Sequence, residues 1–135
     1  MKNTIDDIAE KGNMLFDAGK YEQAVNVWQK GLELLEKPLN VQSEAVWFQT
    51  SIADAYFMLG DYQTAYSYLT AARSNLSGEG YDPFVMLRLG QCCFELGRDD
   101  AREYLLRAYM SEGEEIFDGE DGKYLDAIKD LIQNA

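Results

Sequence analysis

The chain has 135 residues, of which 47% are hydrophobic, and this suits one domain with a modest core. Its 12 basic and 24 acidic side chains give a formal net charge of −12 at pH 7. This balance argues against a nucleic-acid partner or an anionic membrane surface, because both would repel the chain. It favours a basic protein partner, although an acidic surface also serves simply to keep a protein in solution.

Side chains suited to catalysis or metal binding are scarce. Histidine, the commonest general base and metal ligand, does not occur. Cys92 and Cys93 are adjacent, and a disulfide between neighbours on a helix would be strained, so we interpret them as buried thiols in a reducing compartment. Ser77 and Ser111 have no recognisable activating base. We therefore expect no enzymatic activity, no cofactor and no metal.

The acidic segment 118–123 has the composition of a calcium-binding loop but not its pattern. An EF-hand loop needs glycine at its sixth place and a bidentate acid at its twelfth. Counted from Asp118, these places hold Lys123 and Lys129. We interpret the segment as a solvated acidic turn.

The N-terminal residues contain no apolar stretch typical of a signal peptide. No window of the sequence approaches the roughly 18 apolar residues of a membrane span. We expect a cytoplasmic protein.

In chain order, the patterns predict three helical hairpins and a final helix. Thr4, followed three residues later by an acid, can cap the first helix, and Asp82 before Pro83 is a typical helix start. The hairpins are predicted at about 4–37, 41–77 and 82–117. A capping helix is predicted at about 121–134, where apolar residues recur at helical spacing.

One pattern recurs at the turn of each hairpin. A glycine is followed four or five residues later by alanine, in the pairs Gly19 and Ala24, Gly60 and Ala65, and Gly97 and Ala101. Each glycine suits the left-handed conformation that ends a helix, and each alanine allows two helices to approach closely. Four residues after the alanines stand Trp28, Leu69 and Leu105, and three further on stand the small residues Gly31, Ala72 and Ala108.

The preceding helices carry a matching pattern, with Ile8, Gly12 and Leu15, then Gln49, Ala53 and Tyr56, then Met86, Gly90 and Cys93. Together these segments resemble the tetratricopeptide repeat (TPR), whose motif runs W-x2-L-G-x2-Y, A-x3-F and P. The resemblance implies an all-α fold, a right-handed α-solenoid in a single domain over 1–135. The repeats are spaced by more than the usual roughly 34 residues, so we expect longer loops around 37–40 and 77–81.

By resemblance to TPR proteins, the first helix of each hairpin would line a concave surface that binds a partner. The residues expected there are Asp6, Glu10, Asn13 and Asp17, then Trp47, Thr50, Ser51, Asp54 and Met58, then Phe84, Arg88, Gln91 and Glu95. Trp47 and Phe84 are expected to be partly exposed. Phe16, Phe57 and Phe94 share this face, and packing between neighbouring helices is the alternative role for them.

Some TPR proteins bind the carboxylate of a chaperone tail through a clamp of basic residues and asparagines. By resemblance, Asn13 fits one clamp position here. The basic positions hold Ala9, Leu87 and Gln91, and the second asparagine position holds Asp54. We therefore do not expect an adaptor for an acidic chaperone tail.

The C-terminal stretch from Ala108 to Leu125 resembles the tail of small bacterial repeat proteins, some of which look like immunity proteins of polymorphic or contact-dependent toxins. From 112 to 130 it carries eight acids and two lysines, which would complement a basic toxin. The first hypothesis is an inhibitor that neutralises such a toxin. The alternative is a chaperone or scaffold for a secreted or regulatory protein. In either case we expect a monomer or a weak homodimer.

Overall fold

The computed structural model describes residues 4–35, 43–74 and 82–132, and these contain helices and turns but no strand. They belong to two compact units, Met1–Gly80 and Tyr81–Ala135, which we call the N-terminal unit and the C-terminal unit. The predicted all-α fold of helical hairpins is confirmed. The predicted loops around 37–40 and 77–81 lie outside the described residues. A single domain over 1–135 stays a prediction.

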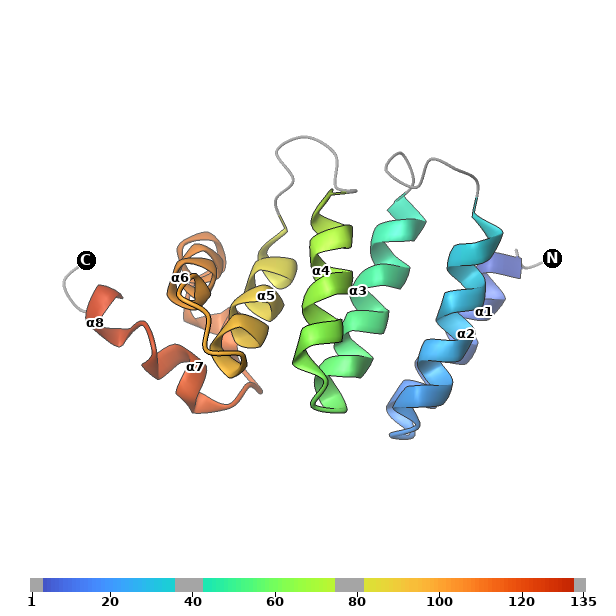
Figure 1. The fold of residues 1–135 in the computed structure, drawn as a ribbon, viewed down its shortest axis with the longest axis horizontal. Coiled ribbons are helices and arrows are strands. Elements are labelled where there is room, and N and C mark those ends of the chain that lie inside the picture. Colours follow the sequence, from blue (N-terminus) through green and yellow to red (C-terminus); the bar gives the residue numbers. More distant parts are fainter. Residues whose placement is uncertain (1–3, 36–42, 75–81, 133–135) are drawn as a thin grey trace. The chain divides into compact units, whose positions relative to one another are not determined.

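The N-terminal unit consists of two hairpins. The first joins α1 (Thr4–Asp17) to α2 (Tyr21–Leu34), and the second joins α3 (Ser43–Met58) to α4 (Tyr62–Ser74). Helix α2 packs against α3, so that the hairpins stand side by side (Figure 1). The ends of the predicted repeats, 4–37 and 41–77, extend into residues that the structure does not describe.

The hairpin turns have the predicted conformation. Gly19, Gly60 and Gly97 have φ angles of 77°, 80° and 71°, in the left-handed region. In the first turn the Lys20 amide donates to the Leu15 carbonyl at 2.8 Å, and the Gly19 amide donates to Phe16 at 2.9 Å. This pair of bonds is a Schellman motif, which explains why each helix stops at its glycine.

The core of the N-terminal unit forms where small residues admit large rings. Ala24 and Ala65 are fully buried, as predicted, and Trp28 is only 2% exposed. The Trp28 indole N–H donates to the Ala9 carbonyl at 3.3 Å, so it ties α2 to α1. Gly12 of α1 lies against the same indole. The glycine at the first hairpin's motif position therefore makes room for the largest side chain of the core.

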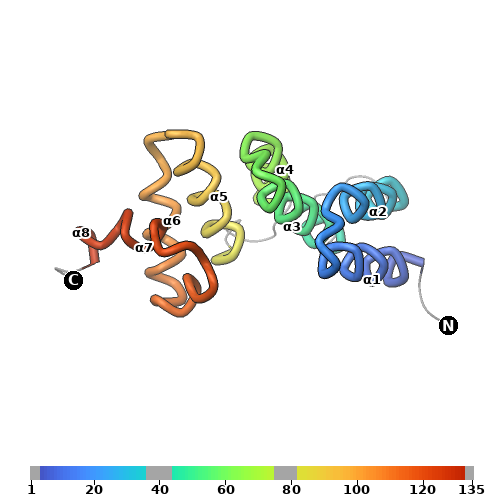
Figure 2. The backbone as a smooth tube through the Cα atoms, turned by 90° about the horizontal axis from the view of Figure 1, so that it is seen from below, coloured from blue at the N-terminus to red at the C-terminus, as the bar shows by residue number. Residues whose placement is uncertain are grey.

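The C-terminal unit contains one hairpin and a C-terminal segment that contacts the first helix of that hairpin. Helix α5 (Pro83–Glu95) pairs with α6 (Ala101–Glu112), and the 3₁₀ helix η2 (Glu114–Phe117), α7 (Gly122–Asp126) and α8 (Lys129–Ile132) follow (Figure 2). The predicted start of α5 is confirmed, because the Asp82 carboxylate accepts bonds from the Phe84 and Val85 amides.

The final helix differs from the prediction of one helix over about 121–134. Two short helices, α7 and α8, stand there instead, and the end of the predicted range lies outside the described residues. The break coincides with the Ala127 carbonyl, which accepts a hydrogen bond from Arg102 Nε of α6 at 3.1 Å. Ile128 beside it is fully buried.

The two cysteines lie on α5, and both are buried. Burial raises the pKa of the Cys93 thiol to about 12, and the nearby Asp100 side chain contributes to the increase. Cys93 is therefore a packing residue rather than a nucleophile, as the sequence indicates. Within the described parts of the chain, none of the helices is long and apolar enough to cross a membrane.

Candidate functional site

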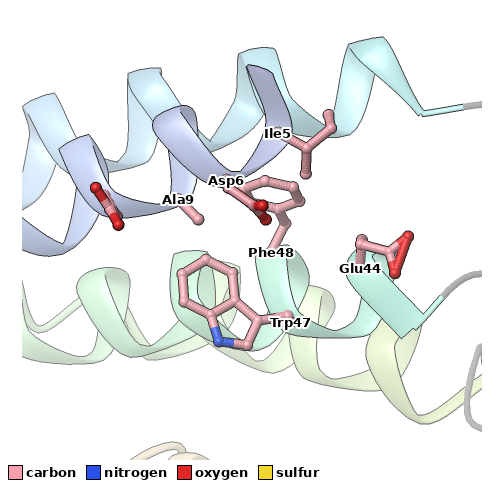
Figure 3. Close-up of a pocket in the computed structure, with 7 residues that line it drawn as sticks. Ile5, Asp6, Ala9, Glu44, Trp47 and Phe48 are labelled. Carbon is pink, nitrogen blue, oxygen red and sulfur yellow. The ribbon is translucent and has the colours of Figure 1, made fainter. Parts of the chain in front are cut away.

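A pocket of about 430 Å³ opens between α1 and α3 in the N-terminal unit. Figure 3 shows Ile5, Asp6 and Ala9 on the α1 side, with Trp47 and Phe48 across from them on α3. Glu10 and Glu44 complete the lining. The pocket therefore combines an apolar and aromatic surface with three carboxylates, and we call it the α1/α3 pocket.

The aromatic side of the α1/α3 pocket is held in place by ring contacts. Trp47 is 40% exposed, as expected, and meets Trp28 and Phe48 edge-on, with ring centroids 5.8 Å and 5.4 Å away. Phe48 is fully buried and fills the space beside Gly31. Trp47 is thus a firmly supported ring with part of its surface exposed.

The other predicted residues of the N-terminal unit do not line this pocket. Asn13 and Asp17 are exposed on α1, and Met58 is exposed on α3. Thr50, Ser51 and Asp54 are half-buried. Phe16 packs edge-on against Tyr21 at 5.0 Å, and Phe57 against Tyr62 at 5.4 Å, so both rings have a packing role.

On α5 the prediction of partner-facing side chains is wrong for Gln91 and Arg88. Gln91 is fully buried and Arg88 is 8% exposed. Both donate to Oε1 of Glu120, which precedes α7, at 2.7 Å from Gln91 Nε2 and 2.5 Å from Arg88 Nη1. The chain's own C-terminal segment covers this part of α5. Phe84 stays 37% exposed, as expected, with the Arg88 guanidinium 5.0 Å from its ring centroid.

The predicted site residue Glu95 is also engaged by the C-terminal segment. Its Oε2 accepts a hydrogen bond from the Tyr124 hydroxyl at 2.6 Å and pairs with Lys123 Nζ at 2.7 Å. Phe94 meets the Tyr124 ring edge-on at 5.5 Å. Burial opposes ionisation of Glu95, but the bonds from Lys123 and Tyr124 outweigh it and lower the pKa below its ordinary value. We therefore assign Glu95 to the attachment of α7.

The lowered pKa of Glu95 predicts an acid-sensitive C-terminal unit. A carboxylate with a depressed folded-state pKa adds stability that is complete above the unfolded pKa and is lost as pH falls through the folded pKa. We expect the free energy of unfolding to decline as pH drops below the ordinary glutamate value of 4.5. Urea unfolding across this range should show a shallower decline for Glu95→Gln than for the unaltered chain. Equal declines would contradict the assigned role of Glu95.

Several residues that line the α1/α3 pocket or bond to α5 were not among the predicted site residues. Ile5, Phe48 and Glu44 line the α1/α3 pocket, and Glu44 stands one helical turn before Trp47, a spacing that could have indicated it. Glu120 and Lys123 were interpreted only as parts of an acidic tail. No local pattern pairs them with α5, about 30 residues earlier in the chain.

Comparisons with known proteins find neither a matching family model nor a matching curated protein sequence. Solved structures do match. The first TPR of Spaghetti (RPAP3) bound to the HSP90 peptide SRMEEVD has a TM-score of 0.70 and 23% identity, covering 96% of this chain and 94% of that chain. The TPR2AB domain of yeast Sti1, in a complex with pHSP90, has a TM-score of 0.69 and 21% identity, covering 96% of this chain and 48% of that chain.

A third structure, the Sgt2 TPR domain from Aspergillus fumigatus, has a TM-score of 0.66 and 20% identity, over 98% of this chain and 82% of that chain. All three descriptions name TPR domains, and the likeness extends over nearly the whole sequence. At 20–23% identity, the comparison supports a shared fold and nothing further. The chain therefore has the helical-hairpin fold of tetratricopeptide-repeat domains.

Proposed function

We propose that this chain is a non-catalytic module that binds an extended segment of another protein, as a chaperone or scaffold does. The α1/α3 pocket carries the proposal, because it offers a supported aromatic ring and carboxylates in a space of about 430 Å³. A pocket of this size accepts one or a few side chains of a partner. Rigid aromatic anchors of this kind commonly supply much of the binding energy in protein interfaces.

One of the similar structures supports a peptide as the ligand, since the RPAP3 structure is bound to an HSP90 peptide, and the Sti1 structure is a complex with pHSP90. The positions that resemblance assigns to a carboxylate clamp are different here. Ala9 and Asp54 are not basic or amide residues, and Leu87 and Gln91 are buried in α5. We therefore expect a basic segment as the partner, rather than an acidic tail.

Photo-crosslinking tests the proposed function. The photoreactive residue p-benzoylphenylalanine is placed at Asn13, exposed on α1, and as a control at Gln63, exposed on α4. The segment crosslinked from the position of Asn13 is identified by mass spectrometry and synthesised as a peptide. We expect this peptide to bind the unaltered chain. A partner that binds only when folded, or equal crosslinking from both positions, would overturn the proposal.

The change Trp47→Ala is expected to weaken binding of that peptide by about 30-fold or more, because truncated aromatic anchors typically cost at least about 2 kcal/mol. Met110→Ala, which alters a side chain 73% exposed on α6, is the matched control and should leave binding unchanged. Isothermal titration measures both, and circular dichroism checks that helicity is retained. Unchanged binding by the Trp47 variant would remove this residue from the site.

A toxin inhibitor of the immunity type is the second candidate, and the exposed acids of the C-terminal unit favour it. Glu112, Glu114, Glu115, Asp118 and Asp121 are all exposed. Such a surface would steer a basic folded toxin to the chain. Under this alternative a toxin encoded by a neighbouring gene would lose its activity on binding, and its unfolded peptides would not bind. Sedimentation over a concentration range would test the expected monomer or weak homodimer in either case.

A further inference from the structure

The residues that line the α1/α3 pocket indicate which kind of ligand side chain it can hold. This inference about the ligand rests on the proposed function. Asp6, Glu10 and Glu44 bring three carboxylates to the pocket, and its described lining includes no lysine or arginine. Ile5, Ala9 and the open part of Trp47 form an apolar surface beside them. A ligand side chain that fits both parts has a long apolar stem and a cationic head.

The C-terminal unit already contains cations bound by aromatic rings and carboxylates. The Lys123 ammonium pairs with Glu95 at 2.7 Å and lies 5.9 Å from the Phe94 ring centroid. The Arg88 guanidinium pairs with Glu120 and lies over Phe84. These contacts show that a carboxylate and an aromatic ring of this chain can together hold a cationic side chain.

Trp47 and Phe84 occupy the same position in their hairpins, two residues before Gln49 and Met86 of the repeat motif. Arg88 lies over the Phe84 ring, and beside Trp47 the α1/α3 pocket gathers the carboxylates of Asp6, Glu10 and Glu44. We propose that the α1/α3 pocket binds an arginine side chain of an extended partner segment. Arginine is favoured over lysine, because its planar guanidinium stacks on tryptophan and pairs with carboxylates in a two-pronged geometry.

Blocked peptides test this directly. The probes are acetyl-GSRLRSG-amide and two counterparts in which both arginines are replaced by citrulline, which is neutral and similar in shape, or by lysine. The two tryptophan indole N–H signals, from Trp28 and Trp47, are followed by nuclear magnetic resonance. We expect the arginine peptide to shift the Trp47 signal saturably and to bind about tenfold more tightly than the citrulline peptide. The lysine peptide should fall between them. Equal affinities for all three would overturn the proposal.

Matched double variants separate the pocket from the overall negative charge. Asp6→Asn with Glu44→Gln removes two charges at the pocket, and Glu33→Gln with Asp99→Asn removes two exposed charges elsewhere. We expect the first pair to weaken binding of the arginine peptide about tenfold and the second pair to change it less than about twofold. Equal losses would mean that net charge attracts the peptide, and the assigned site would be wrong.

The outcome also separates this inference from the proposed function. If the arginine peptide does not bind, but a partner segment is still crosslinked from Asn13 and binds as a peptide, the cationic ligand is wrong and the peptide-binding function stands. If no segment is crosslinked and no probe binds, both proposals fail.

Discussion

Replacing Gly12 with alanine is expected to lower the free energy of unfolding by about 2–3 kcal/mol. An added Cβ would lie 2.0 Å from Trp28 Nε1 and 2.4 Å from Cε2 of the same ring. Trp28 is almost fully buried, so its indole has no free space into which it could move. Displacing it would also weaken the hydrogen bond to the Ala9 carbonyl, which contributes about 1 kcal/mol.

Helix propensity alone predicts the opposite sign for Gly12→Ala, because alanine is favoured over glycine by about 1 kcal/mol inside a helix. Gly122→Ala is therefore the control, since an added Cβ at this position of α7 would meet nothing within 4 Å. Urea unfolding should find this control neutral or slightly more stable. The cost of Gly12→Ala should shrink in a Trp28→Phe background. A stabilising effect in the unaltered background would mean that α1 does not approach the indole so closely.

The change Glu120→Ala is expected to destabilise the C-terminal unit by about 3 kcal/mol. It removes the carboxylate that pairs with Arg88 and accepts from Gln91, and the two side chains of the ion pair are only 10% and 19% exposed. Removing one partner leaves the other charge buried, and this costs more than the pair contributes. Urea unfolding, with hydrogen exchange at the α5 amides, measures the loss.

The triple change Arg88→Met, Gln91→Met and Glu120→Leu should recover much of that stability, because it removes both buried charges together with the buried amide that bonds to them, and keeps apolar volume. Glu103→Gln is the control, since its partner Arg107 is exposed and such surface pairs contribute at most about 1 kcal/mol. If Glu120→Ala costs no more than this control, the C-terminal segment does not cover α5 as described.

The hairpins could be predicted from the sequence because their determinants are local. Gly19, Gly60 and Gly97 end their helices through backbone conformation, and the alanines that follow are buried by helical spacing. The break between α7 and α8 could not be predicted in this way. It coincides with a bond from Arg102, on another helix, and no proline or glycine marks it.

The candidate site was predicted only in part. Asp6, Glu10 and Trp47 do line the α1/α3 pocket, because the repeat pattern places them on one face. The same pattern placed Arg88 and Gln91 on the equivalent face of α5. Periodicity identifies such a face, but it cannot indicate that a segment some 30 residues later will cover it.

The burial of Cys92 and Cys93 makes the chain suited to selective chemical labelling. Thiol reagents react with the thiolate, and burial keeps Cys93 protonated near neutral pH while both sulfurs are shielded from solvent. A cysteine introduced at exposed Met58 would thus be the accessible thiol. A dye attached there would mark one defined position of α3 with both native cysteines left in place.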